Sequence, residues 1–332
     1  MKNMRVVVTR IGGPEVVQVL SDAAPEPKAG EVRLRVLAAG VSQADITIRE
    51  GFYTNSVKTP FTLGYDCVGV VEKLGAGVQQ LRVGDHVAAI TVRGSHAEYI
   101  CWPADDCAPI PADVDPVKAV CLLLNYMTAY QMLHRVAQIK AGDRLLVHSA
   151  AGGVGSALVQ LGHLAGAELY GTASSSKLDF VRGLGATPID YTTEDFVERV
   201  RSFVPGGVDV VFDAIGGANF SRSFETLTPR GQFVGYGFTA KVGQRFGRVD
   251  TFARLGWMFI ARGGRKVAFY GIMFMKKDHA DWFRADLQEL LRLYQSGQID
   301  PAVSAVLPLQ QAREALALLE TRKVSGKVVL TP

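Results

Sequence analysis

Residues 144–161 read RLLVHSAAGGVGSALVQL, and they constrain the fold more than any other stretch of the chain. A short apolar run leads directly into small residues and glycines, and an amphipathic segment follows. This order predicts a buried strand, a tight turn and a helix, which is the context of a dinucleotide-binding turn. The usual G-x-G-x-x-G pattern is present with Ala150 in the first position and with Gly152 and Gly155 in the others.

The glycine turn has a predicted role at the phosphates of a dinucleotide. Gly152 lacks a Cβ atom, so the backbone can approach a pyrophosphate, and Gly155 lets the helix pack closely on the strand. A helix that begins near Val154 would direct unpaired N–H groups and a partial positive charge at the phosphates. The residues expected to contact the cofactor here are Ala151, Gly152, Gly153, Val154 and Gly155.

The next predicted strand indicates which dinucleotide is bound. NAD-selective sites carry Asp or Glu roughly 20 residues after the turn, where the carboxylate binds the ribose hydroxyls. Here the stretch is GTASSSK, with Ala173 near the acidic position. The hydroxyls of Ser174 and Ser175 with the Lys177 ammonium suit a 2′-phosphate instead. Tyr191, at the end of the third predicted strand, could reach the same phosphate. The sequence therefore predicts NADPH rather than NADH.

The hydrophobic pattern divides the 332 residues into two domains. The first 120 residues contain closely spaced strand patterns with glycine turns, which are typical of a small barrel or sandwich. Strands and helices then alternate, as in a parallel α/β sheet. Residues 239–265 break this alternation, because arginines surround the apolar run 257–260. We interpret them as a helical insertion: a packed helix with solvated arginines, a pocket lid, or a patch that faces a membrane or a partner.

Composition excludes several classes of function. Apolar residues make up 48% of the chain and charged residues 20%, so the chain is expected to fold. The net charge of +4 is scattered rather than clustered, which argues against nucleic-acid binding. No apolar run approaches the roughly 18 residues of a membrane span. The N-terminus lacks the pattern of a signal peptide, so we expect a cytoplasmic protein. The four cysteines lack CxxC spacing and are interpreted as buried thiols.

Motifs along nearly the whole chain resemble one family. The segment 142–160 is similar to the quinone oxidoreductase signature, and His163 departs from it where Lys, Arg or Ser is usual. Further similar segments are GGPEVVQV (12–19), GVSQADITIREGFY (40–53), LGYDCVGVVEKLGAGV (63–78), VGDHVAA (83–89) and GKVVL (326–330). The chain thus resembles the zinc-free medium-chain dehydrogenases/reductases of the quinone oxidoreductase, or zeta-crystallin, branch. The stretches LLLNYMTAYQML, GTASSSK and PIDY are especially similar to the vesicle amine transport protein-like subgroup.

This resemblance implies a fold and an assembly. The expected fold class is α/β, with a doubly wound Rossmann sheet and a chaperonin-10-like, β-rich catalytic domain. The catalytic domain is expected to comprise residues 1–125 and 276–332, and the NADPH-binding Rossmann domain residues 126–275. Family members pair through the last strand of the Rossmann sheet, so a homodimer is expected through KVAFYG (266–271).

The resemblance also implies chemistry without a metal. The three positions that hold catalytic zinc in related alcohol dehydrogenases fall on Ser42, Tyr65 and Leu124, and a leucine cannot coordinate zinc. The six histidines are isolated from one another in the sequence and are interpreted as core or surface residues. Without a Lewis acid, hydride transfer from NADPH is easiest to an electron-poor acceptor. A quinone or an α,β-unsaturated carbonyl is therefore the expected small-molecule partner.

Residues near the substrate are also inferred from the resemblance. Ser42, Asp45 and Tyr53 match polar or aromatic cleft positions, although Ser42 stands where many relatives carry Asn and Thr47 where some carry Tyr. Tyr53 is a candidate proton donor or a wall aromatic, with solvent as the alternative proton source. The remaining cofactor candidates are one residue at the domain junction and three after the fifth Rossmann strand: Thr128, Tyr236, Gly237 and Phe238.

Two other functions compete with an NADPH:quinone reductase. The chain could be a non-catalytic NADPH-binding or regulatory protein, with the insertion making a peripheral contact with a membrane or partner. It could also be an enoyl-thioester reductase, which should carry a basic track for a pantetheine carrier, and no such track can be assigned.

Overall fold

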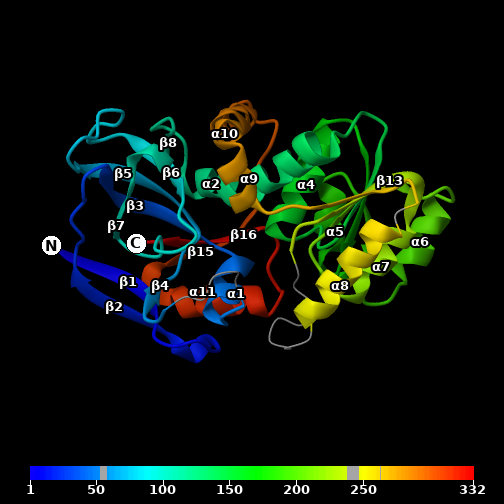
Figure 1. Ribbon diagram of the computed structural model, residues 1–332, viewed down its shortest axis with the longest axis horizontal. Helices are drawn as coiled ribbons and strands as arrows, with labels where there is room; N and C mark the ends of the chain where they lie inside the picture. The colour runs from blue at the N-terminus through cyan, green and yellow to red at the C-terminus, as the bar shows by residue number, and fades with distance from the viewer. Residues whose placement is uncertain (53–57, 238–246, 262) are drawn as a thin grey trace. The chain divides into compact units, whose positions relative to one another are not determined.

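The computed structural model describes residues 1–52, 58–237, 247–261 and 263–332, without the side chains of 247–249, 252 and 280 (Figure 1). The chain forms two compact units, one of residues 1–124 and 300–332 and the other of residues 125–299. The sequence analysis assigns residues 276–332 to the first domain. In the structure, the carboxylate of Asp286 instead accepts hydrogen bonds from Gln131 and Arg135, which holds residues 280–295 on the second unit.

The first unit is built from two β-sheets. The larger sheet has the strand order β15-β16-β3-β5-β6-β8, and β7 also pairs with β3. Its strands are β3 (Glu31–Val41), β5 (Asp66–Leu74), β6 (His86–Ile90), β7 (Tyr99–Pro103), β8 (Cys107–Pro109), β15 (Val303–Pro308) and β16 (Lys327–Thr331). The smaller sheet, β2-β1-β4, contains β1 (Lys2–Val8), β2 (Val17–Ala23) and β4 (Phe61–Thr62). The helices of this unit are α1 (Gln43–Arg49), α2 (Pro116–Cys121) and α11 (Ala312–Glu320).

Strand β3 shows how the sequence determines the core of the first unit. Val32 and Leu34 are fully buried and alternate with arginines, as expected for a strand with one face on the core. Arg33 on the other face forms ion pairs with Glu26 and Glu72. The C-terminal strand belongs to the same sheet, because β16 pairs antiparallel with β3.

The second unit contains a six-stranded parallel sheet with the order β11-β10-β9-β12-β13-β14 (Figure 1). Its strands are β9 (Arg144–Val147), β10 (Glu168–Ala173), β11 (Thr187–Asp190), β12 (Val208–Asp213), β13 (Leu227–Gly235) and β14 (Lys266–Phe269). Numbered along the chain, the order is 3-2-1-4-5-6, which is the Rossmann order. The predicted fold class, a β-rich unit with a parallel α/β unit, is confirmed.

Helices connect and cover this parallel sheet. They are α3 (Met127–Tyr130), α4 (Gly153–Leu164), α5 (Leu178–Gly183), α6 (Phe196–Phe203), α7 (Ala218–Glu225), α8 (Gly247–Ile260), α9 (Ile272–Asp278) and α10 (Ala280–Gln295). Two π-helical turns, 122–126 and 131–137, flank α3. The core beneath the helices is apolar and includes Leu146, Phe220 and Phe233.

Helix α8 is the described part of the predicted insertion. Its inner face is a stripe of Thr251, Leu255 and Met258, all buried, with the last two in the core of the unit. Phe259 and Ile260 are exposed, the latter by 86%. Helical spacing alone predicts that either Trp257 with Ile260 or Leu255 with Phe259 shares a pocket-lining face. The second alternative is wrong, because the helix directs Leu255 into the core and leaves Phe259 at the surface.

Candidate functional site

The carboxyl end of β9 carries the glycine turn, and its geometry explains two of the glycines. Ser149 has a left-handed backbone with φ of 54°, and its carbonyl accepts a hydrogen bond of 2.8 Å from the Gly152 N–H. A Cβ atom on Gly155 would lie 2.1 Å from the Ser149 carbonyl oxygen. A Cβ atom on Gly153 would lie 2.2 Å from Nδ2 of Asn125. Gly155 thus allows close packing of helix and turn, and Gly153 makes room for the Asn125 amide.

The N-terminus of α4 fits an anionic group. Gly152 is the N-cap residue, and no side chain caps the first turn of the 12-residue helix. The first N–H groups of a helix have no partner within it, and they carry the positive end of the helix dipole. A Cβ atom on Gly152 would meet nothing within 4 Å except the Ser149 carbonyl at 3.2 Å, so the turn presents bare backbone. Ala151 is buried, and Val154 is partly buried on the first turn.

The ends of β10 and β11 lie side by side next to this turn. Ala173 pairs with Asp190 in the parallel ladder, and the Tyr191 N–H donates to the Ala173 carbonyl over 3.2 Å. The structure therefore brings Tyr191 to the end of β10, where Ser174 begins the turn that contains Lys177. Tyr191 is 49% exposed, and partial burial lowers the pKa of Lys177 from its usual range.

Asp190 is a residue at this edge that the sequence interpretation did not single out. Its carboxylate accepts hydrogen bonds from the Ser175 hydroxyl and from both the N–H and the hydroxyl of Thr192. These donors, first that of Ser175, lower the pKa of Asp190, so the buried group is a carboxylate at neutral pH. The signal was present in the PIDY motif, but it could be interpreted only once the pairing of β10 with β11 was known.

The ends of β12 and β13 carry further predicted cofactor residues at the same carboxyl edge of the parallel sheet. The Tyr236 N–H donates to the Asp213 carbonyl over 3.0 Å, which places Tyr236 and Gly237 beside the end of β12. Burial raises the pKa of the Tyr236 phenol well above its ordinary value, so the group stays protonated at neutral pH. Phe238, the third candidate from this strand, lies outside the described residues.

Thr128 is held near the end of β14. It lies on α3, which packs against α4, and is almost fully buried. Its hydroxyl hydrogen-bonds the Tyr270 phenol, which also donates to Oε1 of Gln131 over 2.8 Å. Asp286 accepts from the amide of the same Gln131 over 2.9 Å. The hydroxyl predicted to bind the cofactor therefore already belongs to a buried hydrogen-bond network.

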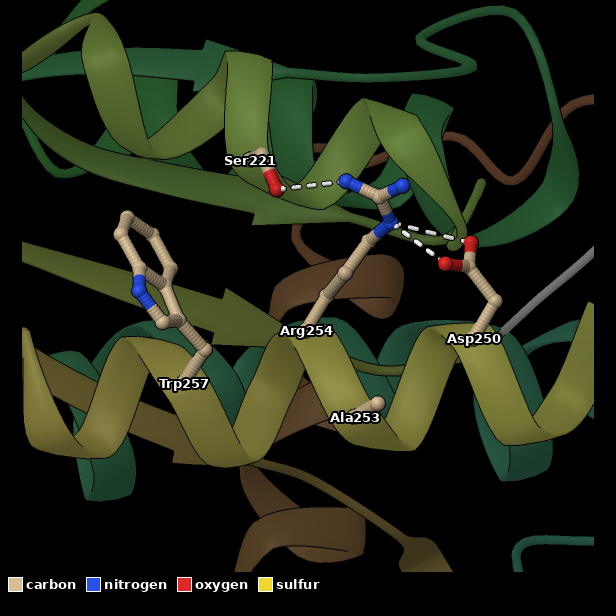
Figure 2. Close-up of a pocket in the computed structure, with 5 residues that line it drawn as sticks. All are labelled: Ser221, Asp250, Ala253, Arg254 and Trp257. Carbon is tan, nitrogen blue, oxygen red and sulfur yellow. Dashed lines mark hydrogen bonds and ion pairs between the residues drawn. The ribbon is translucent and has the colours of Figure 1, made fainter.

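A hollow of about 440 Å³ lies between α7 and α8, and its lining residues include none of the predicted cofactor residues (Figure 2). Figure 2 shows Arg254 reaching from α8 to Ser221 on α7 while it also pairs with Asp250. The side chain of Trp257, 54% exposed, stands beside it on α8. The guanidinium is occupied by these partners, so we assign the hollow no part in the cofactor site.

Comparisons with known proteins match two regions of the chain. A family model described as an alcohol dehydrogenase GroES-like domain matches residues 28–112, and one described as a zinc-binding dehydrogenase matches residues 184–330. The human synaptic vesicle membrane protein VAT-1 homolog is 32% identical, with 98% of this chain and 86% of that protein covered. A 2-haloacrylate reductase from a Burkholderia species is also 32% identical, with 99% of both chains covered.

Solved structures agree with these relatives. Escherichia coli quinone oxidoreductase in complex with NADPH superimposes with a TM-score of 0.90 at 29% identity, over 99% of this chain and all of that one. A mycobacterial protein in complex with NADPH gives 0.87 at 31% identity, with 99% of this chain and all of that one covered. The chain belongs to the quinone oxidoreductase-like branch of the medium-chain dehydrogenases/reductases.

In this quinone oxidoreductase-like protein, Ser42 and Asp45 form a capping box at the start of α1. Asp45 accepts from the N–H and the hydroxyl of Ser42 over 2.8 and 2.6 Å, and from the Gly64 N–H over 3.0 Å. Both side chains are buried, so the structure shows them fixing α1 to the segment before β5. Tyr53, the third predicted catalytic residue, lies outside the described residues.

The positions that correspond to zinc ligands in related dehydrogenases contain no metal-binding set. Tyr65 is 2% exposed, and Leu124 offers no donor atom. Within the described ranges, no group of three or more His, Cys, Asp or Glu side chains is arranged to hold a metal ion. All four cysteines are thiols, and burial raises the pKa of Cys121 to about 12. Cys101 is only partly buried, unlike the expectation for all four.

None of the described helices is both long and apolar enough to span a membrane.

Proposed function

We propose that this protein is an NADPH-dependent, zinc-independent reductase that transfers a hydride to an α,β-unsaturated carbonyl compound or a quinone. The observation that carries the proposal is the glycine turn. It places an uncapped helix N-terminus at the carboxyl edge of a Rossmann sheet, where phosphates of dinucleotides bind. When bound, NADPH supplies the hydride, and the protein supplies binding and orientation.

Three groups of residues in the second unit divide the binding of NADPH among them. The backbone of 151–155 would hold the pyrophosphate. Ser174, Lys177 and Tyr191 would hold the 2′-phosphate at the ends of β10 and β11, where no carboxylate occupies position 173. Tyr236 and Gly237, with Phe238 and Thr128 as further candidates, would lie at the nicotinamide end.

The acceptor class is supported by the names of similar proteins. One is a 2-haloacrylate reductase, another is a quinone oxidoreductase, and a third, the CurK enoyl reductase, has a TM-score of 0.85 at 26% identity. Acrylates, quinones and enoyl groups share an electron-poor carbon conjugated to a carbonyl or carboxyl group. Such a carbon accepts hydride without a Lewis acid, and the product then takes up one proton, with solvent or Tyr53 as the source.

The experiment is a turnover assay that follows NADPH oxidation by absorbance. The acceptors are 1,4-benzoquinone, 9,10-phenanthrenequinone, an enone, 2-chloroacrylate and an enoyl-pantetheine thioester, each with NADPH and with NADH. We expect turnover with NADPH and at least one of the first four acceptors. Tight NADPH binding with no turnover would instead support a non-catalytic NADPH-binding protein that serves a membrane or partner. Turnover of the thioester alone would identify an enoyl-thioester reductase.

A further inference from the structure

A continuous chain of buried hydrogen bonds runs beneath the glycine turn. The Ser149 N–H donates to Oγ1 of Thr172 over 3.3 Å, and this hydroxyl lies 3.1 Å from Nδ1 of His148. On the other side of the imidazole, Nε2 lies 2.9 Å from Oγ of Ser223. That hydroxyl in turn donates to the Asp213 carboxylate over 2.6 Å. The side chains of His148, Thr172, Ser223 and Asp213 are at least 98% buried.

The partners determine where each proton lies. The Asp213 carboxylate accepts from the Asn219 amide and from the backbone N–H groups of Ile215 and Gly216, so it also accepts the single proton of Ser223. Toward Nε2 of His148 the Ser223 oxygen can then act only as an acceptor, as it also does toward the Asn219 amide over 3.4 Å. Because a neutral imidazole carries one N–H, Nδ1 is an acceptor and receives the Thr172 hydroxyl proton. The Thr172 oxygen keeps a lone pair for the Ser149 N–H.

Thr172 controls the shape of the dinucleotide turn through two bonds. Its hydroxyl receives the Ser149 N–H, and its backbone carbonyl receives the Ala150 N–H over 3.0 Å. Ser149 is not a glycine, yet it holds a φ of 54°, which side chains rarely adopt without support from their surroundings. Its carbonyl lies under the first turn of α4, where it accepts the Gly152 N–H. The orientation of Ser149 thus fixes where the exposed N–H groups of α4 begin.

We propose that His148 is a positioning residue, present as the neutral Nε2–H tautomer, which orients Thr172 and thereby holds Ser149 and the phosphate-binding turn in their left-handed geometry. This inference rests on the proposed function only in assigning NADPH as the group that the turn binds. The hydrogen-bond chain also connects the end of β12 to the glycine turn. One imidazole therefore bridges the turn after β9 and the end of β12.

The surroundings of His148 favour the neutral ring. Phe196 of α6 packs its ring edge-on against the imidazole, with centroids 4.7 Å apart. Burial lowers the pKa of His148, Asp213 of β12 opposes this shift, and Arg222 of α7 adds to it. Arg222 lies over the Phe196 ring and pairs with Asp195 at the start of α6. The Asp213 charge does not reverse the shift, because burial is its largest cause.

The test pairs Thr172→Val with Thr172→Ser. Valine keeps the shape and the β-branch but lacks the hydroxyl, whereas serine restores it. We expect Thr172→Val to raise the Kd for NADPH about tenfold, the effect of one lost buried hydrogen bond, and Thr172→Ser to stay within about twofold of the parent protein. In the reductase assay, neither Thr172 variant should change the KM for the acceptor. Amide hydrogen exchange at residue 149 should accelerate in Thr172→Val alone.

A second measurement does not depend on NADPH. Nitrogen-15 NMR of the histidine-labelled parent protein should show Nε2 of His148 protonated and Nδ1 unprotonated at pH 7. An Nδ1–H tautomer would overturn the proposal, and so would equal Kd values in the two Thr172 variants. If the parent protein does not bind NADPH at all, the proposed function fails. The tautomer and the exchange at residue 149 then still decide whether His148 holds the turn.

Discussion

Asp190 holds the hydroxyl of Ser175 at the point where β10 and β11 end side by side. The Ser175 oxygen also lies 2.9 Å from the Thr192 hydroxyl, so the Ser175 hydroxyl is engaged by residues at the end of β11. An acidic residue is therefore present near the predicted 2′-phosphate position, but one strand further along the sheet. Its charge is stabilised by Ser175 and Thr192, which leaves Ser174, Lys177 and Tyr191 as the candidates for the phosphate.

Replacing Lys177 by alanine should weaken NADPH binding by roughly one to two orders of magnitude, because one charge-assisted hydrogen bond to a phosphate is lost. NADH lacks the 2′-phosphate, so its affinity should hardly change. Titration of nucleotide fluorescence measures both values. Lys140→Ala is the matched control, since this exposed lysine precedes β9 and lies at the opposite edge of the same sheet. Equal losses for NADPH and NADH in Lys177→Ala would contradict the assignment.

The serines 174 and 175 should behave differently although they are neighbours. Ser174→Ala should raise the Kd for NADPH severalfold and leave the folded state as stable as before. Ser175→Ala removes a donor to Asp190 and should lower the free energy of unfolding by about 1 kcal/mol, with little change in the preference for NADPH. Chemical denaturation and nucleotide titration of both variants separate the two effects. The distinction would be lost if Ser175→Ala changed nucleotide preference more than Ser174→Ala does.

The sequence predicted the parts of the site that depend on local patterns. The strand, turn and helix of 144–161 could be recognised because glycines and apolar residues there follow fixed spacings. The absence of an acidic residue could be recognised as well, because Ala173 ends the very next strand. The partners of Asp190 and His148 could not be predicted in this way. They come from strands and helices up to 75 residues apart, and only the pairing of the parallel strands and the packing of α7 on the sheet bring them together.

The substrate side of the sequence prediction was less specific for a similar reason. Ser42 and Asp45 have the spacing of a capping box, and a polar pair three residues apart has the same pattern whether it caps a helix or lines a cleft. Leu255 and Phe259 share a helical spacing, but the helix could have turned either side to the sheet. The burial of Leu255 and Met258 shows which side of the helix faces the sheet. The hydrophobic periodicity of six residues could not show this.

Reductase activity should not depend on a metal ion. Leu124 cannot coordinate zinc, and the Ser42 hydroxyl is bound to Asp45, so no ligand set is expected at the position used by related dehydrogenases. Exhaustive chelation should leave the rate of NADPH oxidation unchanged, and elemental analysis should find no stoichiometric zinc. Activity that disappears on chelation and returns with zinc would refute this prediction.

The stability of the second unit should decrease in mildly acidic solution because of His148. Burial lowers the pKa of this imidazole in the folded protein, whereas the unfolded chain titrates near the ordinary value of about 6.5. Above that pH both states are neutral and the group contributes nothing. As the pH falls below it, the unfolded chain binds the proton first, so the free energy of unfolding declines until the folded pKa is passed.

The matched comparison is His148→Gln, which keeps a donor toward Ser223 but does not titrate. It should be less stable than the parent protein at pH 7.5, and the difference should narrow between about pH 6.5 and 5. His134, whose pKa burial also lowers, remains in both proteins and cancels in the comparison. Denaturation curves at several pH values give the difference directly, and a gap that stays constant with pH would exclude titration of His148 as its cause.

The outer edge of β14 should pair with a second copy of this chain. Along the described part of the sheet, β14 pairs with β13 on one side and is the terminal strand of the order. This terminal strand carries the apolar residues Val267 and Ala268, and the backbone groups on the outer side of a terminal strand are available for a partner strand to bind. Light scattering at micromolar concentration should give twice the mass of one chain, and a monomer mass at all concentrations would remove the prediction.

Two proline variants locate the contact. Successive residues of a strand direct their N–H groups to opposite sides, so Val267→Pro and Ala268→Pro each remove a donor from a different edge of β14. One variant should lose a bond to β13 and become less stable. The other should keep its thermal stability as a folded chain and yield monomers, since its missing N–H faces the partner. If both variants stay dimeric while one is destabilised, the dimer forms through another surface and the edge of β14 is covered within the chain.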